Sequence, residues 1–188
     1  MGTGVLSYQD PITNLQIVQL TQGPSPARKT YFSNESWGSD DEWIYFAGMR
    51  PDSTCPEVLG VHELSGRLRS IIGHEALVQG SLGLDRHRDL AYVLIQETIY
   101  QINLDTLGAE PIAQIPPGAR CTAPFTASLS GLVVNSYQLA QGPYALITTD
   151  PGDGTVEIIY RSDTPLGHCQ FCPGDDTTIF YVHETGGD

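Results

Sequence analysis

The feature that most constrains the fold of this chain is a repeat of about 45 residues. Four short apolar segments each follow a polar turn, and their first apolar residues are Ile44, Leu90, Leu132 and Ile179. The intervals between them are 46, 42 and 47 residues. Runs rich in Val, Ile, Tyr and Thr alternate with clusters of Gly, Pro, Asp and Ser, and helical periodicity is nearly absent. A repeat of this length with four strands in each unit is typical of β-propeller blades.

Each complete repeat predicts four strands in the same order. A first strand precedes the polar turn, the strong apolar strand follows the turn, and two further strands come after shorter turns. We therefore expect an all-β chain with a single β-propeller domain over residues 1–188. Its predicted blades are about 31–72, 80–115, 122–162 and an incomplete 166–188, with 5–21 as the outer strands of a closing blade.

The incomplete terminal blades allow two kinds of closure. The N-terminal strands could complete the C-terminal half-blade and close a four-bladed ring, or the chain could be part of a larger propeller. An end blade without a partner exposes an apolar face and a strand edge. We expect a compact monomer in the first case and self-association of the isolated chain in the second. The periodicity alone does not choose between them.

The charge and hydropathy of the chain exclude several classes of partner. Its net charge is −13, from 22 acidic and 9 basic residues, whereas a phosphate-binding face needs clustered Lys and Arg. We therefore expect no nucleic-acid partner. No apolar run approaches the roughly 18 residues of a membrane span, so we expect no membrane insertion. The N-terminus lacks the basic start and apolar stretch of a signal peptide, which favours a cytoplasmic location.

Cys169 and Cys172 form a Cys-x-x-Cys pair beside a histidine, a pattern that can indicate zinc. One pair without a second pair at matching spacing is a weak zinc signal. The pattern is better explained by two small residues that are buried or half-buried in a blade.

The segment "LGHCQFCPGDDTTIFYVHETG", from Leu166 to Gly186, resembles a stretch of the oligogalacturonate lyases. Propellers of that family carry His-x-Gln-Phe/Tyr-x-Pro-x-Asp followed by His-Glu-Gly. The likeness extends back through "YALITTDPGDGTVEIIYRSDTPLGH", "SLGLDRHRDLAYVLIQETIYQINLDTL" and "YFSNESWGSDDEWIYFAGMRPDS" to the opening "DPITNLQIVQLTQGP". Nearly the whole chain is covered, although the repeat motifs are generic to WD40-like propellers.

This resemblance implies that the chain is the N-terminal half of a seven-bladed propeller, which favours the larger propeller over the closed ring. The family cleaves short galacturonate chains, the breakdown products of pectin, by β-elimination with a divalent metal, typically manganese. The implied partner is therefore an oligogalacturonide. The family's metal-binding histidines lie in blades beyond Asp188, so the resemblance assigns no metal ligand in this chain.

The resemblance also implies roles for individual residues. β-Elimination needs a base, and His168 matches the base proposed for the family; a neutral imidazole suits that role near pH 7. Gln170, two residues further along the strand, points to the same side and would orient the substrate or the imidazole. His183 and Glu184 match the family's His-Glu and would form a polar wall of the cleft. Arg50 would bind a substrate carboxylate, or else it lies in a surface turn of its blade.

One departure from the family pattern bears on activity. The family has an Arg just before the strand matched by "ALITTD", where this chain has Tyr144 and Ala145. A positive partner for the substrate carboxylate is therefore missing, and we expect little or no lyase activity from the 188 residues alone. The alternative function is a non-catalytic WD40-like propeller that presents its loops to a protein or a glycan. The acidity favours this alternative, whereas the motif after Leu166 favours the lyase.

Overall fold

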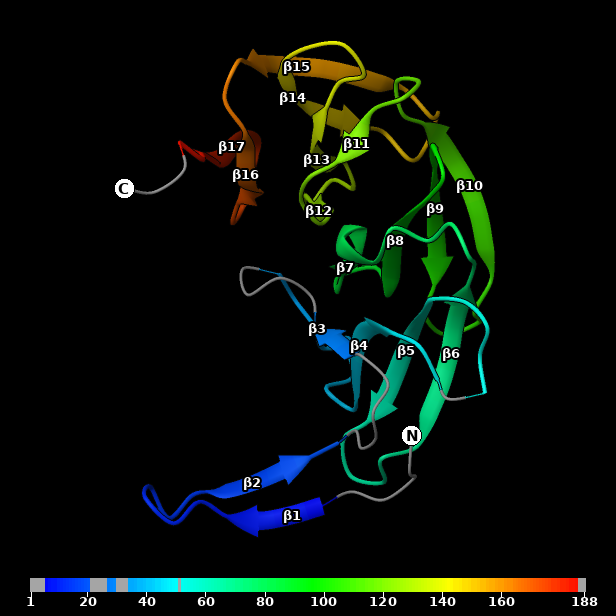
Figure 1. Ribbon diagram of the computed structural model, residues 1–188, viewed down its shortest axis with the longest axis vertical. Helices are drawn as coiled ribbons and strands as arrows, with labels where there is room; N and C mark the ends of the chain where they lie inside the picture. The colour runs from blue at the N-terminus through cyan, green and yellow to red at the C-terminus, as the bar shows by residue number, and fades with distance from the viewer. Residues whose placement is uncertain (1–5, 21–26, 30–33, 51, 186–188) are drawn as a thin grey trace.

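The computed structural model describes residues 6–20, 27–29, 34–50 and 52–185. These residues form antiparallel β-sheets that follow one another along an open arc (Figure 1). The N-terminal hairpin comprises β1 (Leu6–Gln9) and β2 (Gln16–Gln19). Blade 1 comprises β3 (Ala27–Lys29), β4 (Trp43–Gly48), β5 (Glu57–His62) and β6 (Leu68–Gly73).

The next two blades repeat the order of blade 1. Blade 2 begins after the short 3-10 helix η1 (Gln79–Ser81) and comprises β7 (Gly83–Asp85), β8 (Leu90–Ile95), β9 (Thr98–Asn103) and β10 (Ala109–Gln114). Blade 3 comprises β11 (Arg120–Cys121), β12 (Thr126–Ala127), β13 (Val133–Gln138), β14 (Tyr144–Thr149) and β15 (Val156–Ser162). Its first-strand position is split, because β11 and β12 both pair with β13. The half-blade comprises β16 (Leu166–Cys172) and β17 (Asp175–His183).

The structure confirms the predicted all-β propeller architecture, including the larger propeller that the resemblance favoured over a closed four-bladed ring. The described residues form an open arc, so the four-bladed ring that the sequence left open is not what the chain adopts. The first strand of blade 1 lies at Ala27–Lys29, whereas the repeat, with that blade beginning at about residue 31, would place it at 31–37, just before the polar turn. Residues 31–33 of that expected strand lie outside the described part of the chain, and Trp37 makes only an isolated bridge to Ile44.

The core lies between the blades. In β8 every residue after Leu90 is buried, because one face of the strand packs on blade 1 and the other on blade 3. Strands that are covered on both faces read as continuous apolar runs, which explains segments such as "LAYVLI". Tyr45 and Val93 pack in the cluster between blades 1 and 2. Tyr92 and Phe125 pack in the cluster between blades 2 and 3.

Blades 2 and 3 make a close backbone contact between β7 and the segment before β12. An added Cβ on Gly83 of β7 would lie only 2.0 Å from the carbonyl oxygen of Phe125. The Phe125 N–H donates to the Ser81 carbonyl at 3.0 Å, and Asn34 Nδ2 donates to the Phe125 carbonyl at 2.9 Å. Residue 83 must therefore be glycine for Phe125 to lie close enough to form these two hydrogen bonds.

Both ends of the arc expose apolar side chains. All eight residues of β1 and β2 are exposed. On β17, Phe180 is 64% exposed and Val182 is 41% exposed. No helix in the described part of the chain is long and apolar enough to cross a membrane.

Candidate functional site

His168 lies in an irregular part of β16. Gly167 pairs with Val182 and Gln170 pairs with Phe180, so His168 and Cys169 together oppose a single residue of β17. This arrangement is a β-bulge, a feature that commonly redirects a side chain next to an active site. His168 has a φ of 53°, in the left-handed region that glycine favours. A non-glycine residue there is strained by about 1–2 kcal/mol, and such strain concentrates at functional sites.

The carboxylate of Glu184 lies beside the His168 imidazole. Its Oε1 is 3.6 Å from His168 Nε2, and the His168 side chain is 26% exposed. The Glu184 N–H donates to the Pro165 carbonyl at 2.9 Å, which holds the end of β17 against the start of β16. An added Cβ on Gly167 would lie 1.8 Å from Glu184 Oε1, so glycine at this position leaves room for the carboxylate. The structure thus brings two of the predicted site residues together.

The bulge is also held from the preceding blade. Thr126 Oγ1, on β12 of blade 3, donates to the Cys169 carbonyl at 3.1 Å. Cys169 and Phe171 are buried, whereas His168 and Gln170 are half-buried. His168 and Gln170 therefore share the less buried side of β16. The side chain of Cys169 packs into the core, where burial raises its pKa to about 12, and a protonated thiol is a poor zinc ligand.

His183 is the last residue of β17 and has other partners than Glu184, which follows it. Its Nδ1 is 2.9 Å from Thr164 Oγ1, with donor and acceptor set by the tautomer. Its ring meets Tyr181 edge-on at 5.4 Å and Tyr160 at 6.1 Å between centroids. The described contacts of His183 are thus with the outer part of blade 3 and the half-blade. His183 and Glu184 therefore have different described partners, and their predicted role as a polar wall of the cleft stays a prediction.

Arg50 follows β4 and is held by a buried carboxylate. Its Nε and Nη2 donate to the two oxygens of Glu57 at 3.0 Å each, and its backbone N–H donates to the same group at 3.3 Å. Ser70 Oγ also donates to Glu57, at 2.8 Å. Burial of Glu57 acts to raise its pKa, but these hydrogen bonds outweigh burial and the net pKa is lowered. The described partners of Arg50 therefore give it a structural role in blade 1.

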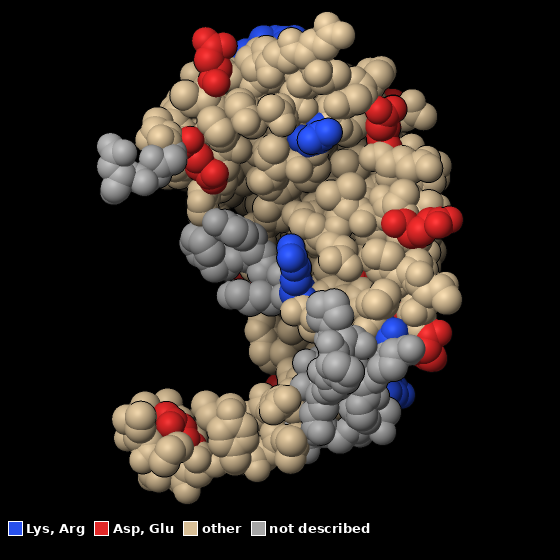
Figure 2. Space-filling view, viewed as in Figure 1, with Lys and Arg blue, Asp and Glu red and all other residues tan. Residues whose placement is uncertain are grey.

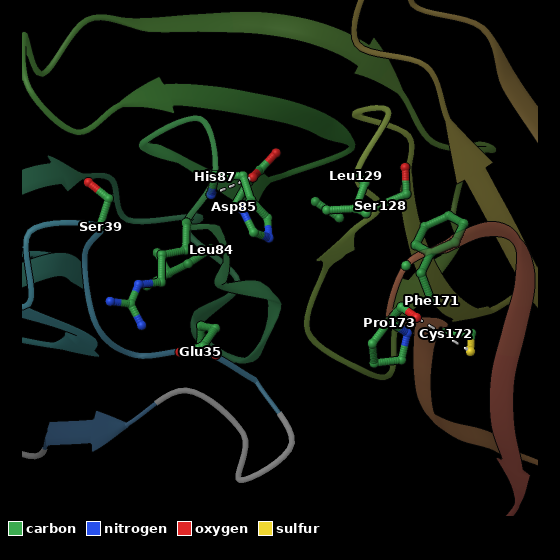
Figure 3. Close-up of a pocket in the computed structure, with 13 residues that line it drawn as sticks. Glu35, Ser39, Leu84, Asp85, His87, Ser128, Leu129, Phe171, Cys172 and Pro173 are labelled. Atoms are coloured by element: carbon green, nitrogen blue, oxygen red, sulfur yellow. Dashed lines mark hydrogen bonds between the residues drawn. The ribbon is translucent and has the colours of Figure 1, made fainter.

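A hollow of about 730 Å³ lies at the other end of the strands from His168 (Figure 3). It is lined by the turns that join the first and second strands of the blades and the half-blade, including Asp85, Ser128 and Cys172. His168 is four residues before Cys172, about 13 Å along an extended strand. None of the five predicted site residues lines this hollow. The hollow and the site predicted around His168 therefore do not coincide, and the hollow is no evidence for that site.

Two arginines in the turn "DRHRD" connect the blades around this hollow. The sequence pattern predicts only a turn between two strands at this place. Arg88 Nη1 donates to the buried carboxylate of Asp85 at 2.7 Å and to the Ser128 carbonyl of blade 3 at 3.2 Å. Arg86 pairs with Asp41 of blade 1. The partners Ser128 and Asp41 lie 40 and 45 residues away along the chain, so no local spacing indicates these links.

Charged groups elsewhere are dispersed. In the face shown in Figure 2, Lys and Arg side chains stand apart from one another and Asp and Glu are scattered around the rim. No group of three or more His, Cys, Asp or Glu side chains that could hold a metal ion occurs within residues 6–20, 27–29, 34–50 and 52–185. These residues therefore do not fit a manganese site by themselves.

No protein-family model matches the sequence, and no curated protein matches it. Solved structures do match. An oligogalacturonate lyase from Vibrio parahaemolyticus superposes on 96% of this chain and 53% of its own chain, with a TM-score of 0.81 and 16% identity. An oligogalacturonate lyase in complex with manganese gives a TM-score of 0.82 at 17% identity, with the same coverage of 96% and 53%. A TolB protein from Agrobacterium tumefaciens gives 0.56 at 15% identity, over 84% of this chain and 60% of its own.

The chain therefore has the fold of about half of an oligogalacturonate lyase propeller, and it spans about half the length of those lyases. The family resemblance predicted from the sequence is confirmed at the level of the fold. At these identities the likeness concerns the fold alone, and the roles of individual residues stay predictions.

Proposed function

We propose that this chain is part of an oligogalacturonate lyase-like propeller that cleaves short galacturonate chains, with His168 as the catalytic base. The observation that carries this proposal is the strained bulge at His168. His168 has a φ of 53°, a backbone conformation that glycine would adopt at lower cost. Its imidazole lies beside the carboxylate of Glu184, which packs against Gly167. The shared fold of the two lyases supports the reaction class.

The proposed reaction is a β-elimination. The neutral His168 imidazole takes the proton from the carbon next to the uronate carboxylate, and the electron pair left behind forms a carbon–carbon double bond. The bond to the glycosidic oxygen breaks, water protonates that oxygen as it leaves, and the proton held by His168 returns to the solvent. Glu184 orients the imidazole, and Gln170, on the same side of β16, contacts the substrate. Removal of that proton also needs a positive charge beside the substrate carboxylate, and within the described residues no side chain is assigned that role.

The described residues leave that positive charge unassigned. This chain has Tyr144 and Ala145 where the family has its Arg, and both side chains are uncharged; Tyr144 is half-buried and Ala145 is fully buried on β14. Arg50 is engaged by Glu57 and His183 by Thr164. If Arg50 and His183 bind substrate as the resemblance implies, they would do so through the parts of their side chains that remain exposed to solvent. We expect the 188 residues alone to show little or no lyase activity.

The test needs the whole propeller that we propose contains this chain. Digalacturonate is the substrate, and the ultraviolet absorbance of the unsaturated product is the signal. His168→Ala should lower kcat by about 10²- to 10⁴-fold, the usual contribution of a general base. His87→Ala, an exposed histidine in the turn at the opposite end of the strands, is the matched control and should keep its activity. An active parent whose His168→Ala variant keeps full activity would show that His168 is structural.

The alternative function is a non-catalytic propeller that binds a protein or a glycan. The net charge of −13 favours this alternative, because the chain repels a polyanion unless a cation is bound. A parent protein that binds digalacturonate or another glycan without forming unsaturated product, with and without manganese, would support it.

A further inference from the structure

The left-handed backbone of His168 needs support from outside the strand that carries it. A residue other than glycine keeps such a conformation only where the surrounding structure imposes it. Neither His168 nor Cys169 has a register partner on β17, so the pairing of β16 with β17 does not by itself fix this part of the bulge. The support therefore comes from the residues next to His168 and from the contacts that hold them.

Cys169, the residue that follows His168, is held in two ways. Its side chain is 3% exposed and packs with Leu146 and Leu166 in the cluster between blade 3 and the half-blade. Its carbonyl oxygen accepts a hydrogen bond from Thr126 Oγ1 at 3.1 Å. A buried side chain and a bonded carbonyl together fix the backbone of Cys169, and they therefore limit rotation of the peptide that joins it to His168.

Thr126 has a fixed position because hydrogen bonds to blade 2 hold the backbone on both sides of it. The N–H of the preceding residue, Phe125, donates to the Ser81 carbonyl at 3.0 Å. Two residues after Thr126, the Ser128 carbonyl accepts from Arg88 Nη1 at 3.2 Å. The Thr126 hydroxyl is therefore presented to β16 from a segment that blade 2 anchors.

We propose that Thr126 is a positioning residue for the His168 imidazole. Its hydrogen bond to the Cys169 carbonyl keeps the bulge in place, and the bulge keeps His168 at a positive φ with its imidazole beside Glu184. Without that bond, His168 relaxes toward the negative φ that a side chain favours, and the imidazole turns away from the carboxylate. The effect on catalysis rests on the proposed function of His168, whereas the effect on its backbone does not.

Thr126→Val tests the proposal directly, because valine keeps the branched shape of threonine and lacks the hydroxyl. In the whole propeller acting on digalacturonate, it should lower kcat by about ten- to a hundredfold and change KM by less than about twofold, since a misplaced base slows the chemical step without removing a substrate contact. Thr126→Ser retains the hydroxyl and should keep kcat within about threefold of the parent. Circular dichroism checks folding, and Thr126→Ala is read in the same way if the valine variant does not fold.

Thr148→Val is the matched control in the same sheet. Thr148 on β14 and Thr126 on β12 both lie opposite Val134, so they share one face of blade 3, and both are half-buried. Within the described residues the Thr148 hydroxyl makes no hydrogen bond to β16. Thr148→Val should therefore leave kcat unchanged. Equal losses of kcat in Thr126→Val and Thr148→Val would show a general effect on blade 3 and overturn the proposal.

A second measurement, on the 188-residue chain labelled with carbon-13 histidine, does not depend on activity. The Cα and Cβ chemical shifts of His168 report its backbone conformation, and His168→Ala identifies the signals by their loss. Thr126→Val should move these signals, whereas Thr126→Ser and Thr148→Val should leave them in place.

The two measurements separate failure of this proposal from failure of the proposed function. Unmoved His168 signals in Thr126→Val overturn the proposal whether or not the parent is a lyase. Moved signals with an unchanged kcat, in a parent that loses activity in His168→Ala, overturn the effect on catalysis. Moved signals in a parent whose His168→Ala variant stays fully active uphold the positioning of His168 by Thr126 and reject His168 as the base.

Discussion

The contact between blades 2 and 3 makes Gly83 the position most sensitive to a single added methyl group. In Gly83→Ala the new Cβ would lie 2.0 Å from the Phe125 carbonyl oxygen and 2.6 Å from the carbonyl carbon. Both are backbone atoms, so rotation of a side chain cannot relieve the overlap. Blade 3 must move away by more than roughly 1 Å to restore ordinary van der Waals separation.

That movement acts on two hydrogen bonds as well as on packing. The Phe125 N–H donates to Ser81 at 3.0 Å and the Phe125 carbonyl accepts from Asn34 at 2.9 Å. Overpacking a buried contact costs about 1–3 kcal/mol, and each of the two hydrogen bonds contributes about 1 kcal/mol. We expect Gly83→Ala to lower the free energy of unfolding by about 3–5 kcal/mol, a large fraction of the stability of a typical domain.

Urea unfolding followed by circular dichroism and tryptophan fluorescence measures this change. The matched control is Gly80→Ala, three residues earlier in η1, where an added Cβ meets nothing within 4 Å. The control should change the free energy of unfolding by less than about 0.5 kcal/mol. If Gly83→Ala unfolds at the same urea concentration as Gly80→Ala, the close approach of the two first strands is not a feature of the folded chain.

Two further predictions concern residues of the candidate site. Because the pKa of Glu57 is lowered in the fold, its ionised form stabilises blade 1 at neutral pH, and this stabilisation should be lost as the pH falls below about 4.5. Glu57→Gln should therefore flatten the pH dependence of the urea midpoint between pH 6 and about pH 3.5, and an unchanged slope would refute the assignment. At His168, glycine relieves the left-handed backbone and alanine does not, so His168→Gly should be more stable than His168→Ala by about 1 kcal/mol. Equal stabilities in urea would mean that the bulge is not strained.

Much of the architecture follows from local sequence patterns. The spacing of the polar turns before Ile44, Leu90 and Leu132 predicts the second strand of each blade, because a repeat can bury its apolar strand only against the next repeat. The turn residues then predict where each chain reversal falls. Blade 1 is less predictable at its first strand, since its short inner strand at Ala27–Lys29 has no apolar pattern to mark it.

The geometry of the candidate site depends on contacts between residues far apart in the sequence, which no local sequence pattern predicts. His168 stood out in the sequence by its motif, but its left-handed φ arises from a slip of register between β16 and β17. The pairing of Arg50 with a buried Glu57, and the links of Arg86 and Arg88 to neighbouring blades, join residues from different strands and different repeats. The sequence by itself determined the repeat, the strands and their apolar faces, because these depend on neighbours along the chain. Only the tertiary structure decided the open arc, the bulge and the ion pairs, because these depend on how blades pack and how paired strands slip in register.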